Sequence, residues 1–221
     1  MRNLIFAGLV LVLFVGSASA AGPHVISFGK PLPVKLFVGP DEVKSVDLKI
    51  RSLYIDGKLK EFTTGEPHDV TDRLFVVRRA YRLNDWLPED EGTNHKWKWQ
   101  RGGWLMVDRE TGRVSQLSLP LFDPFYSVAS WYRDYAAYCG LNDDATKLYA
   151  VVAQVGTKKP VLRREIGAAH NGDLPDSECG APDWQRGPIR VTFAPDSGQK
   201  MTFSIKGHAA EIAVDAEGEE K

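Results

Sequence analysis

Short runs in which apolar and polar residues alternate fill the chain from residue 24 onward, separated by glycine, proline and acidic turns. This two-residue period directs apolar side chains to one face of an extended strand. After the N-terminal apolar segment, no stretch keeps a helical period over several turns. The pattern therefore predicts an all-β fold, with strands beginning near residues 24, 33, 45, 58, 73, 96, 104, 112, 127, 135, 147, 160, 188, 200 and 210.

Turn signals between these runs predict hairpins. The stretch IDGK at 55–58 carries Asp-Gly, and DRETGR at 108–113 places Gly112 where a longer hairpin loop needs a positive φ. Consecutive strands are therefore expected to pair antiparallel. Residues 84–94 and 167–187 contain few alternating positions, so we expect loops there.

The N-terminus has the pattern of a secretory signal peptide. Arg2 precedes an apolar run from Leu4 to Gly16, and small residues follow up to Ala20. A membrane anchor is the alternative, but spanning a bilayer takes about 20 apolar residues, more than this run supplies. We expect a signal peptide at 1–20, one all-β domain at 21–215 and a disordered acidic tail at 216–221. A periplasmic or secreted location follows.

Charge and hydropathy limit the partners. The chain has 28 basic and 29 acidic residues and a net charge of −1, so it lacks the basic excess of a nucleic-acid-binding protein. After signal cleavage, no remaining segment is apolar enough to predict a stable membrane span.

Two cysteines, Cys139 and Cys179, are present. In an exported protein such a pair predicts a disulfide, which here would close a loop of about 40 residues. The chain-entropy model gives that crosslink about 4 kcal/mol of stabilisation. Free buried thiols are the alternative, and a redox-active pair would have closer spacing.

The stretch YSVASWYRDYAAYCGLNDDATKLYAVVAQVGTKKPVLRRE at 126–165 runs through a serine-tryptophan strand, a charged turn, an inner strand, a polar turn and two further strands. This order resembles one blade of a TolB-like or WD40-like β-propeller. Partial likeness extends the blade-like segments to about 96–122, 126–166 and 188–214. The resemblance implies a small or partial β-propeller-like arrangement of antiparallel sheets; a β-sandwich is the alternative. Since propellers host unrelated functions, it implies no catalytic residue.

No motif in the sequence identifies a catalytic residue, a metal site or a cofactor. The densest polar cluster holds Glu66, His68 and Asp69, which can serve as metal ligands or as an acid and base. The interpretation that we prefer is a turn before the strand at Arg73, in which Asp69 or Asp72 bonds backbone amides. We therefore assign no reaction and lean towards a non-enzymatic protein.

Tryptophans are the remaining candidate binding residues, because their rings stack on sugars and anchor interfaces. The candidates are Trp97, Trp99, Trp104, Trp131 and Trp184. Alternation places Trp97 and Trp99 on one strand face, and Arg101-Gly102-Gly103 is expected to end that strand before a second begins at Trp104. A buried sheet face is the competing interpretation of these rings.

The sequence thus predicts an exported, non-enzymatic β-repeat protein that binds another exported protein or a surface polymer such as a polysaccharide. Two alternatives stay open. One is an exported hydrolase of carbohydrate or ester bonds that uses Glu66, His68 and Asp69, and the other is a carbohydrate-binding module built on residues 97–104.

Overall fold

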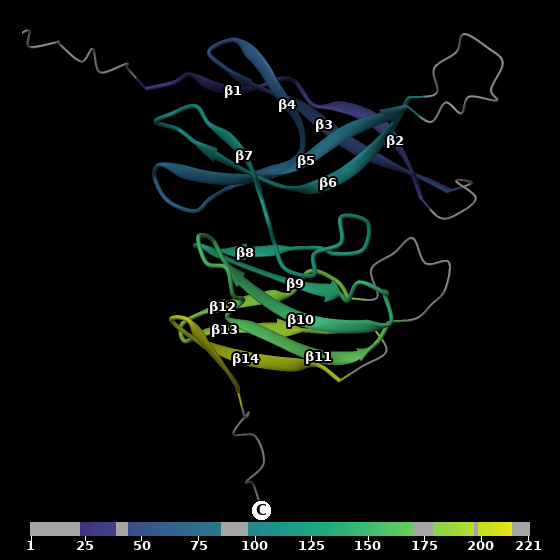
Figure 1. Ribbon diagram of the computed structural model, residues 1–221, viewed down its shortest axis with the longest axis vertical. Helices are drawn as coiled ribbons and strands as arrows, with labels where there is room; N and C mark the ends of the chain where they lie inside the picture. The colour runs from purple at the N-terminus through teal and green to yellow at the C-terminus, as the bar shows by residue number, and fades with distance from the viewer. Residues whose placement is uncertain (1–22, 39–43, 85–96, 170–178, 197–198, 214–221) are drawn as a thin grey trace, which may run out of the picture.

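The computed structural model describes residues 23–38, 44–84, 97–169, 179–196 and 199–213 (Figure 1). These residues form fifteen strands with turns between them and no helix, so the all-β prediction is confirmed. Among them no helix is long and apolar enough to cross a membrane. The predicted signal peptide, the acidic tail and most of the two predicted loops lie outside the described residues.

The first half of the chain forms a seven-stranded sheet, the upper part of Figure 1. Strands β2 to β6 pair antiparallel in chain order, and β2 then pairs parallel with β6 through Leu36 and Trp99. Because five alternating strands leave the first and last pointing the same way, closure requires this parallel contact. We call the ring β2–β6 the closed sheet. The strands are β1 Ile26–Phe28, β2 Leu32–Val38, β3 Lys44–Ile55, β4 Lys58–Asp69, β5 Leu74–Asn84, β6 Trp97–Asp108 and β7 Val114–Leu117.

The closed sheet has an inner face and an outer face. Residues paired directly across neighbouring strands share a face, and the inner face holds an apolar core. That core consists of Leu53, Ile55, Phe75, Val77, Leu105 and Val107. Strand β1 pairs with β3 and β7 pairs with β6, and their side chains Ile26, Phe28 and Val114 cover this core.

The second half forms two four-stranded antiparallel sheets, the lower part of Figure 1. In each sheet the strands lie side by side in chain order. The first contains β8 Ser130–Tyr132, β9 Tyr135–Leu141, β10 Lys147–Gln154 and β11 Leu162–Ala168. The second contains β12 Asp183–Arg186, β13 Ile189–Phe193, β14 Met201–Lys206 and β15 Ala209–Ile212. One buried cluster joins them, with Val152 and Leu148 from the first sheet and Phe193 and Phe203 from the second.

Two of the three predicted blade-like segments coincide with the two four-stranded sheets. Residues 126–166 supply the first four-stranded sheet, and residues 188–214 supply most of the second. Residues 96–122 form no sheet of their own, because β6 and β7 belong to the seven-stranded sheet. The likeness to propeller blades stays a prediction.

Two strand boundaries differ from expectation. The strand at 97–108 is continuous, so the predicted break before Trp104 is wrong. Its register with β5 shifts between Arg78 and Ala80, and Gly102 and Gly103 take up the extra residue as a bulge. Strand β12 lies within the predicted loop 167–187, where pairing with β13 makes Asp183–Arg186 extended despite little apolar alternation.

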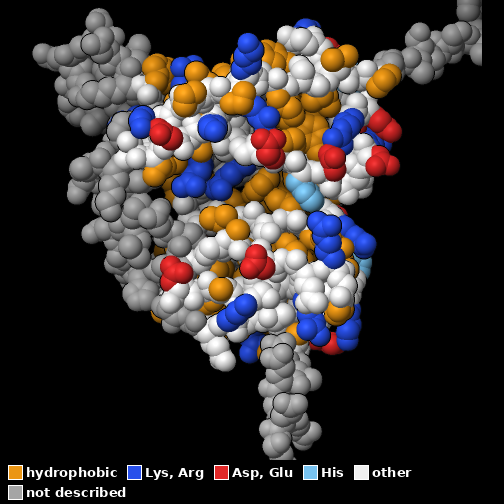
Figure 2. Space-filling model, turned by 180° about the vertical axis from the view of Figure 1, so that it is seen from behind, with side chains coloured by type: hydrophobic (Ala, Val, Ile, Leu, Met, Phe, Trp, Pro, Cys, Tyr) orange, Lys and Arg blue, Asp and Glu red, His pale blue; other side chains and the backbone are white. Residues whose placement is uncertain are grey.

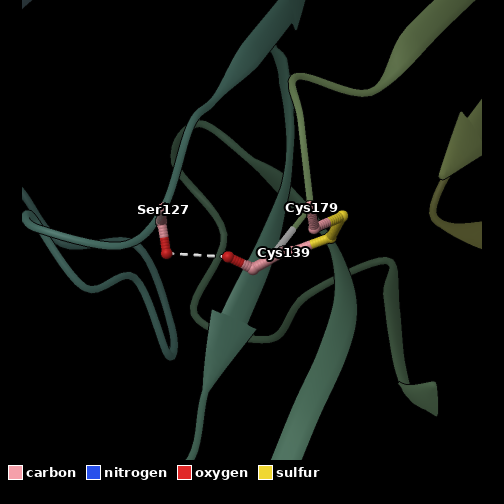
Figure 3. The surroundings of a disulfide bond; sticks show 3 residues. All are labelled: Ser127, Cys139 and Cys179. Atoms are coloured by element: carbon pink, nitrogen blue, oxygen red, sulfur yellow. Dashed lines mark hydrogen bonds between the residues drawn. A yellow bond between two sulfur atoms is a disulfide. The ribbon is translucent and has the colours of Figure 1, made fainter. Parts of the chain in front are cut away.

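The predicted disulfide between Cys139 and Cys179 is confirmed (Figure 3). Cys139 lies in β9, and Cys179 forms a β-bridge with Pro195, just after β13. Both cysteines are fully buried in the cluster that joins the two four-stranded sheets. The crosslink therefore connects these sheets through their shared core.

The linker, residues 118–129, connects the two halves and is bonded to the first four-stranded sheet. Tyr138 donates its hydroxyl to Pro120 O at 2.6 Å, and Leu141 N donates to Leu121 O at 3.0 Å. Ser127 Oγ donates to Cys139 O at 2.7 Å, as Figure 3 shows. A Cβ at Gly140 would lie 2.6 Å from Leu121 O, so the linker passes this strand at a distance that excludes a side chain.

We predict that Gly140→Ala destabilises the protein by about 1–3 kcal/mol, because the added methyl group overlaps the linker backbone. Gly167→Ala is the matched control in the same sheet, since nothing lies within 4 Å of a Cβ there. Urea unfolding of both variants measures the difference. Equal free energies of unfolding for the two variants would contradict the close approach.

Candidate functional site

Strand β7 has a free edge among the described residues. It pairs with β6 along one side, and no other described strand pairs with it. Asp108 N donates to Arg113 O at 3.0 Å at the start of the ladder. Because ladder bonds alternate along an antiparallel strand, Val114 and Gln116 direct their backbone N–H and C=O groups away from β6.

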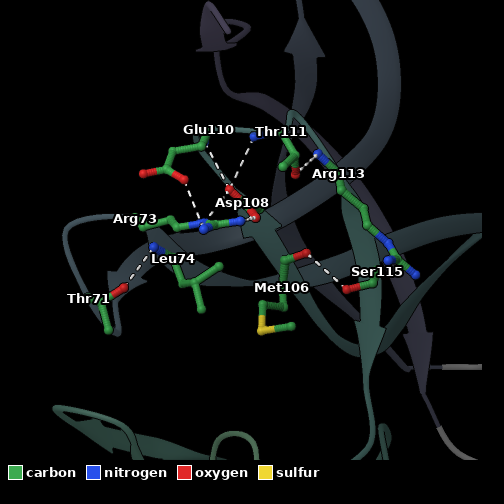
Figure 4. A network of polar contacts seen from close by, with 9 residues as sticks. All are labelled: Thr71, Arg73, Leu74, Met106, Asp108, Glu110, Thr111, Arg113 and Ser115. Atoms are coloured by element: carbon green, nitrogen blue, oxygen red, sulfur yellow. Dashed lines mark hydrogen bonds and ion pairs between the residues drawn. The ribbon is translucent and has the colours of Figure 1, made fainter. Parts of the chain in front are cut away.

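A cavity of about 460 Å³ lies on the outer face beside β7 (Figure 4). Leu74 and Met106 supply its apolar lining, and the register places Ser115 directly across from Met106. Arg73, Asp108 and Arg113 supply charged groups. We call it the outer cavity.

Asp108 organises the charged side of the outer cavity. Both of its carboxylate oxygens accept from Arg73 Nε at 3.0 Å, and Oδ1 also accepts from the backbone N–H of Glu110 at 2.9 Å. The Arg73 guanidinium holds the pKa of Asp108 well below its usual range, and the carboxylate in turn raises the pKa of Arg73. Arg73 also pairs with Glu110 at 2.8 Å, as Figure 4 shows. Both groups are therefore charged near neutral pH.

A second cavity of about 400 Å³ lies on the inner side of β7. Its lining includes Leu105 and Gln116, which face each other across the ladder, together with Lys60. Arg79 and Glu61 form an ion pair at 3.1 Å in the same lining. We call it the inner cavity.

Arg113 and Ser115 line both cavities. The Arg113 side chain is exposed, and its guanidinium makes no ion pair with any described residue, unlike those of Arg73 and Arg79. The free edge of β7 thus lies between two cavities, and the exposed Arg113 guanidinium beside it can meet an acidic group.

The five predicted tryptophans fall into three groups. Trp97 and Trp99 lie under the Arg82 guanidinium at 5.6 and 5.3 Å, and Trp97 is 53% exposed. Trp104 is buried and contacts Trp131 edge-to-face at 5.0 Å.

Trp184 packs instead against two tyrosines of the first four-stranded sheet. Its ring centroid lies 5.6 Å from that of Tyr132 and 6.3 Å from that of Tyr135. Its Nε1 donates to Ser130 O at 3.2 Å. A binding role for the five tryptophans stays a prediction.

The bulge at Gly102–Gly103 changes which rings share a face. Trp97 and Trp99 lie across from Asn84 and Arg82, and Trp104 lies across from Arg78, so all three belong to the outer face. The buried-face interpretation fits Trp104, whereas it is wrong for Trp97.

The polar cluster predicted from Glu66, His68 and Asp69 is divided among separate partners. Glu66 pairs with Arg51 at 2.9 Å, and Asp69 pairs with Arg109. His68 Nε2 donates to Arg133 O at 2.7 Å, and its ring stacks on Trp131 at 5.6 Å. Each side chain therefore has a structural partner, and the described residues contain no group of three or more potential metal ligands.

The sequence analysis did not identify the residues around β7 as a site. Arg73 and Asp108 are 35 positions apart, and the register of β5 with β6 brings them together. Asp108 in DRETGR was a recognisable turn residue, but its pairing with Arg73 left no local signal. No protein-family model and no curated protein matches the chain.

We predict that Asp108→Asn lowers the melting temperature at pH 7 by a few degrees, because the amide keeps the turn but loses the charge opposite Arg73. Since the folded pKa of Asp108 is depressed, its contribution is present above the unfolded pKa of about 3.9 and is lost as the pH falls through the folded value. The difference in melting temperature between the variant and the parent should become smaller only below about pH 4. Thermal unfolding from pH 2 to 8 measures it, and a gap that does not change with pH would contradict the pairing.

Proposed function

We propose that this protein is exported and binds an extended segment of another protein, which adds as a strand to the free edge of β7. The observation that carries the proposal is the position of this edge between two cavities that share Arg113 and Ser115. The proposal assigns no reaction to the protein.

Strand addition uses the two sides of this edge together. An added strand bonds to the outward N–H and C=O groups of Val114 and Gln116, which supplies affinity without regard to sequence. Its successive side chains point to opposite faces, so alternate residues enter the outer and inner cavities. Cavities of about 460 and 400 Å³ have room for side chains of the added segment.

Charge favours an acidic segment. Lys60, Arg73, Arg79 and Arg113 line the two cavities, against the carboxylates of Asp108 and Glu61. Those carboxylates are paired with Arg73 and Arg79, so Arg113 is available for an aspartate or glutamate of the bound segment.

Export is supported by the signal-peptide pattern and by the disulfide, which forms in oxidising compartments. The same setting supports a partner that is itself exported.

We predict that the mature protein begins at Ala21 when the full chain is expressed in a bacterium and recovered outside the cytoplasm. N-terminal sequencing and intact mass identify the cleavage site. A chain that keeps Met1, or one that stays in the cytoplasmic fraction, would contradict export.

We predict that Gln116→Pro abolishes peptide binding at β7 and leaves the fold intact. Proline removes an N–H that points away from β6, so the ladder with β6 keeps its bonds while the added strand loses one. Gln116→Ala is the control, because it shortens the same side chain and keeps the N–H.

The measurement starts from linear peptides selected by display against the parent protein. Expected peptides carry an acidic residue, bind Gln116→Ala within about tenfold of the parent because only a side-chain contact in the inner cavity is lost, and slow amide exchange at Val114 and Gln116. Arg113→Met should weaken them roughly tenfold, the value of one charge-assisted contact. Peptides that bind Gln116→Pro as tightly as the parent would overturn strand addition.

A further inference from the structure

Two arginines lie side by side on the outer face of the closed sheet, where the two halves of the molecule meet. Arg78 in β5 lies across from Trp104, and Arg101 in β6 lies across from Ala80, the next outer-face position of β5. Figure 2 shows Lys and Arg side chains gathered in a recess at the boundary between the halves. We call this place the seam.

Neither arginine has a carboxylate partner among the described residues. Arg78 donates to three backbone carbonyls, those of Gly102 at 3.3 Å, Pro124 at 2.6 Å and Ser127 at 3.4 Å. Its guanidinium also lies 5.5 Å from the Phe122 ring. Burial, followed by repulsion from Arg101, lowers the pKa of Arg78 to about 10. The two guanidiniums therefore lie close together, and the acceptors that Arg78 bonds to are neutral carbonyls.

Across the seam, the carboxylate of Asp123 is the acidic group that raises the pKa of Arg78. Its Oδ1 already accepts from the backbone N–H groups of Phe125 at 2.7 Å and Tyr126 at 2.9 Å. These bonds hold the carboxylate in the turn of the linker, and among the described residues it forms no ion pair with Arg78 or Arg101.

Three buried donors in the seam have no acceptor among the described residues. They are Arg101 Nε, Trp104 Nε1 and Trp131 Nε1. Trp104 and Trp131 contact each other, and Trp104 lies beside Arg78 in the register. Buried N–H groups are normally satisfied, so these donors beside two cations are suited to an anionic acceptor.

We propose that the seam binds a tetrahedral oxyanion, a phosphate or sulfate group. Such a group carries up to two negative charges against the two guanidiniums and offers several oxygens to several donors. Its binding is independent of strand addition at β7, because neither arginine lines either cavity.

The test is a titration of the disulfide-bonded protein with sodium phosphate, with chloride at matched ionic strength as reference. Phosphate should raise the melting temperature in a saturable way and change tryptophan emission, because Trp104 and Trp131 adjoin the site. Glycerol 1-phosphate in a parallel titration separates a free ion from a phosphate group on a larger molecule. Equal responses to phosphate and chloride would overturn the site.

Arg101→Met is the deciding variant. It removes one positive charge and relieves repulsion on Arg78, and the Arg101 side chain makes no hydrogen bond to a described residue, so the fold should persist. Phosphate affinity should fall roughly tenfold or more. Arg113→Met removes the same charge from an exposed side chain outside the seam and should leave phosphate affinity unchanged.

Trp131→Phe provides a second variant, since it keeps an aromatic ring beside Trp104 and removes only the N–H. It should weaken phosphate binding with no change in net charge. Unchanged phosphate affinity in both Arg101→Met and Trp131→Phe would overturn the assignment of the seam.

Discussion

The guanidinium of Arg78 holds the linker against the closed sheet, and the hydrogen bond from His68 to Arg133 O and the Trp104–Trp131 contact join the same two halves. The Arg78 guanidinium leaves the closed sheet and donates to two carbonyls of the linker, those of Pro124 and Ser127. Ser127 in turn donates to the carbonyl of Cys139, whose side chain is bonded to Cys179. One path of hydrogen bonds and the disulfide thus runs through all three sheets, alongside the hydrogen bond from His68 to Arg133 O and the bond from Trp184 to Ser130 O. Because Arg78 is largely buried and charged, loss of its carbonyl acceptors would leave a cation in a poorly solvated place.

Local patterns in the sequence predicted the features that depend on neighbouring residues. The Asp56-Gly57 turn joins β3 to β4 with both residues at positive φ, and Gly112 also has a positive φ. The disulfide followed from the number of cysteines and the expected compartment. Each of these features is decided by chain geometry over a few residues or by the chemistry of one residue type.

Features that depend on register between distant strands could not be predicted. Ring closure depends on one parallel contact between Leu36 and Trp99, and neither residue signals it. Arg73, Asp108 and Arg113 meet only because β5, β6 and β7 lie side by side. Whether an edge of β7 is paired depends on where every other strand lies. The sequence therefore identified strands and turns well, whereas the candidate site appeared only with the sheet.

The bulge in β6 shows how little sequence is needed to set a whole surface. Gly102 and Gly103 add one position to the strand, and the extra position reverses the phase of residues 97 to 101 relative to residues 104 to 108. If β6 had one glycine fewer, residues 97–101 would reverse their faces. Trp97, Trp99 and Arg101 would then point to the inner face of the closed sheet, and Lys98 and Gln100 to its outer face. The pair of glycines therefore decides that Trp97, Trp99 and Arg101 share the outer face of the closed sheet with Trp104.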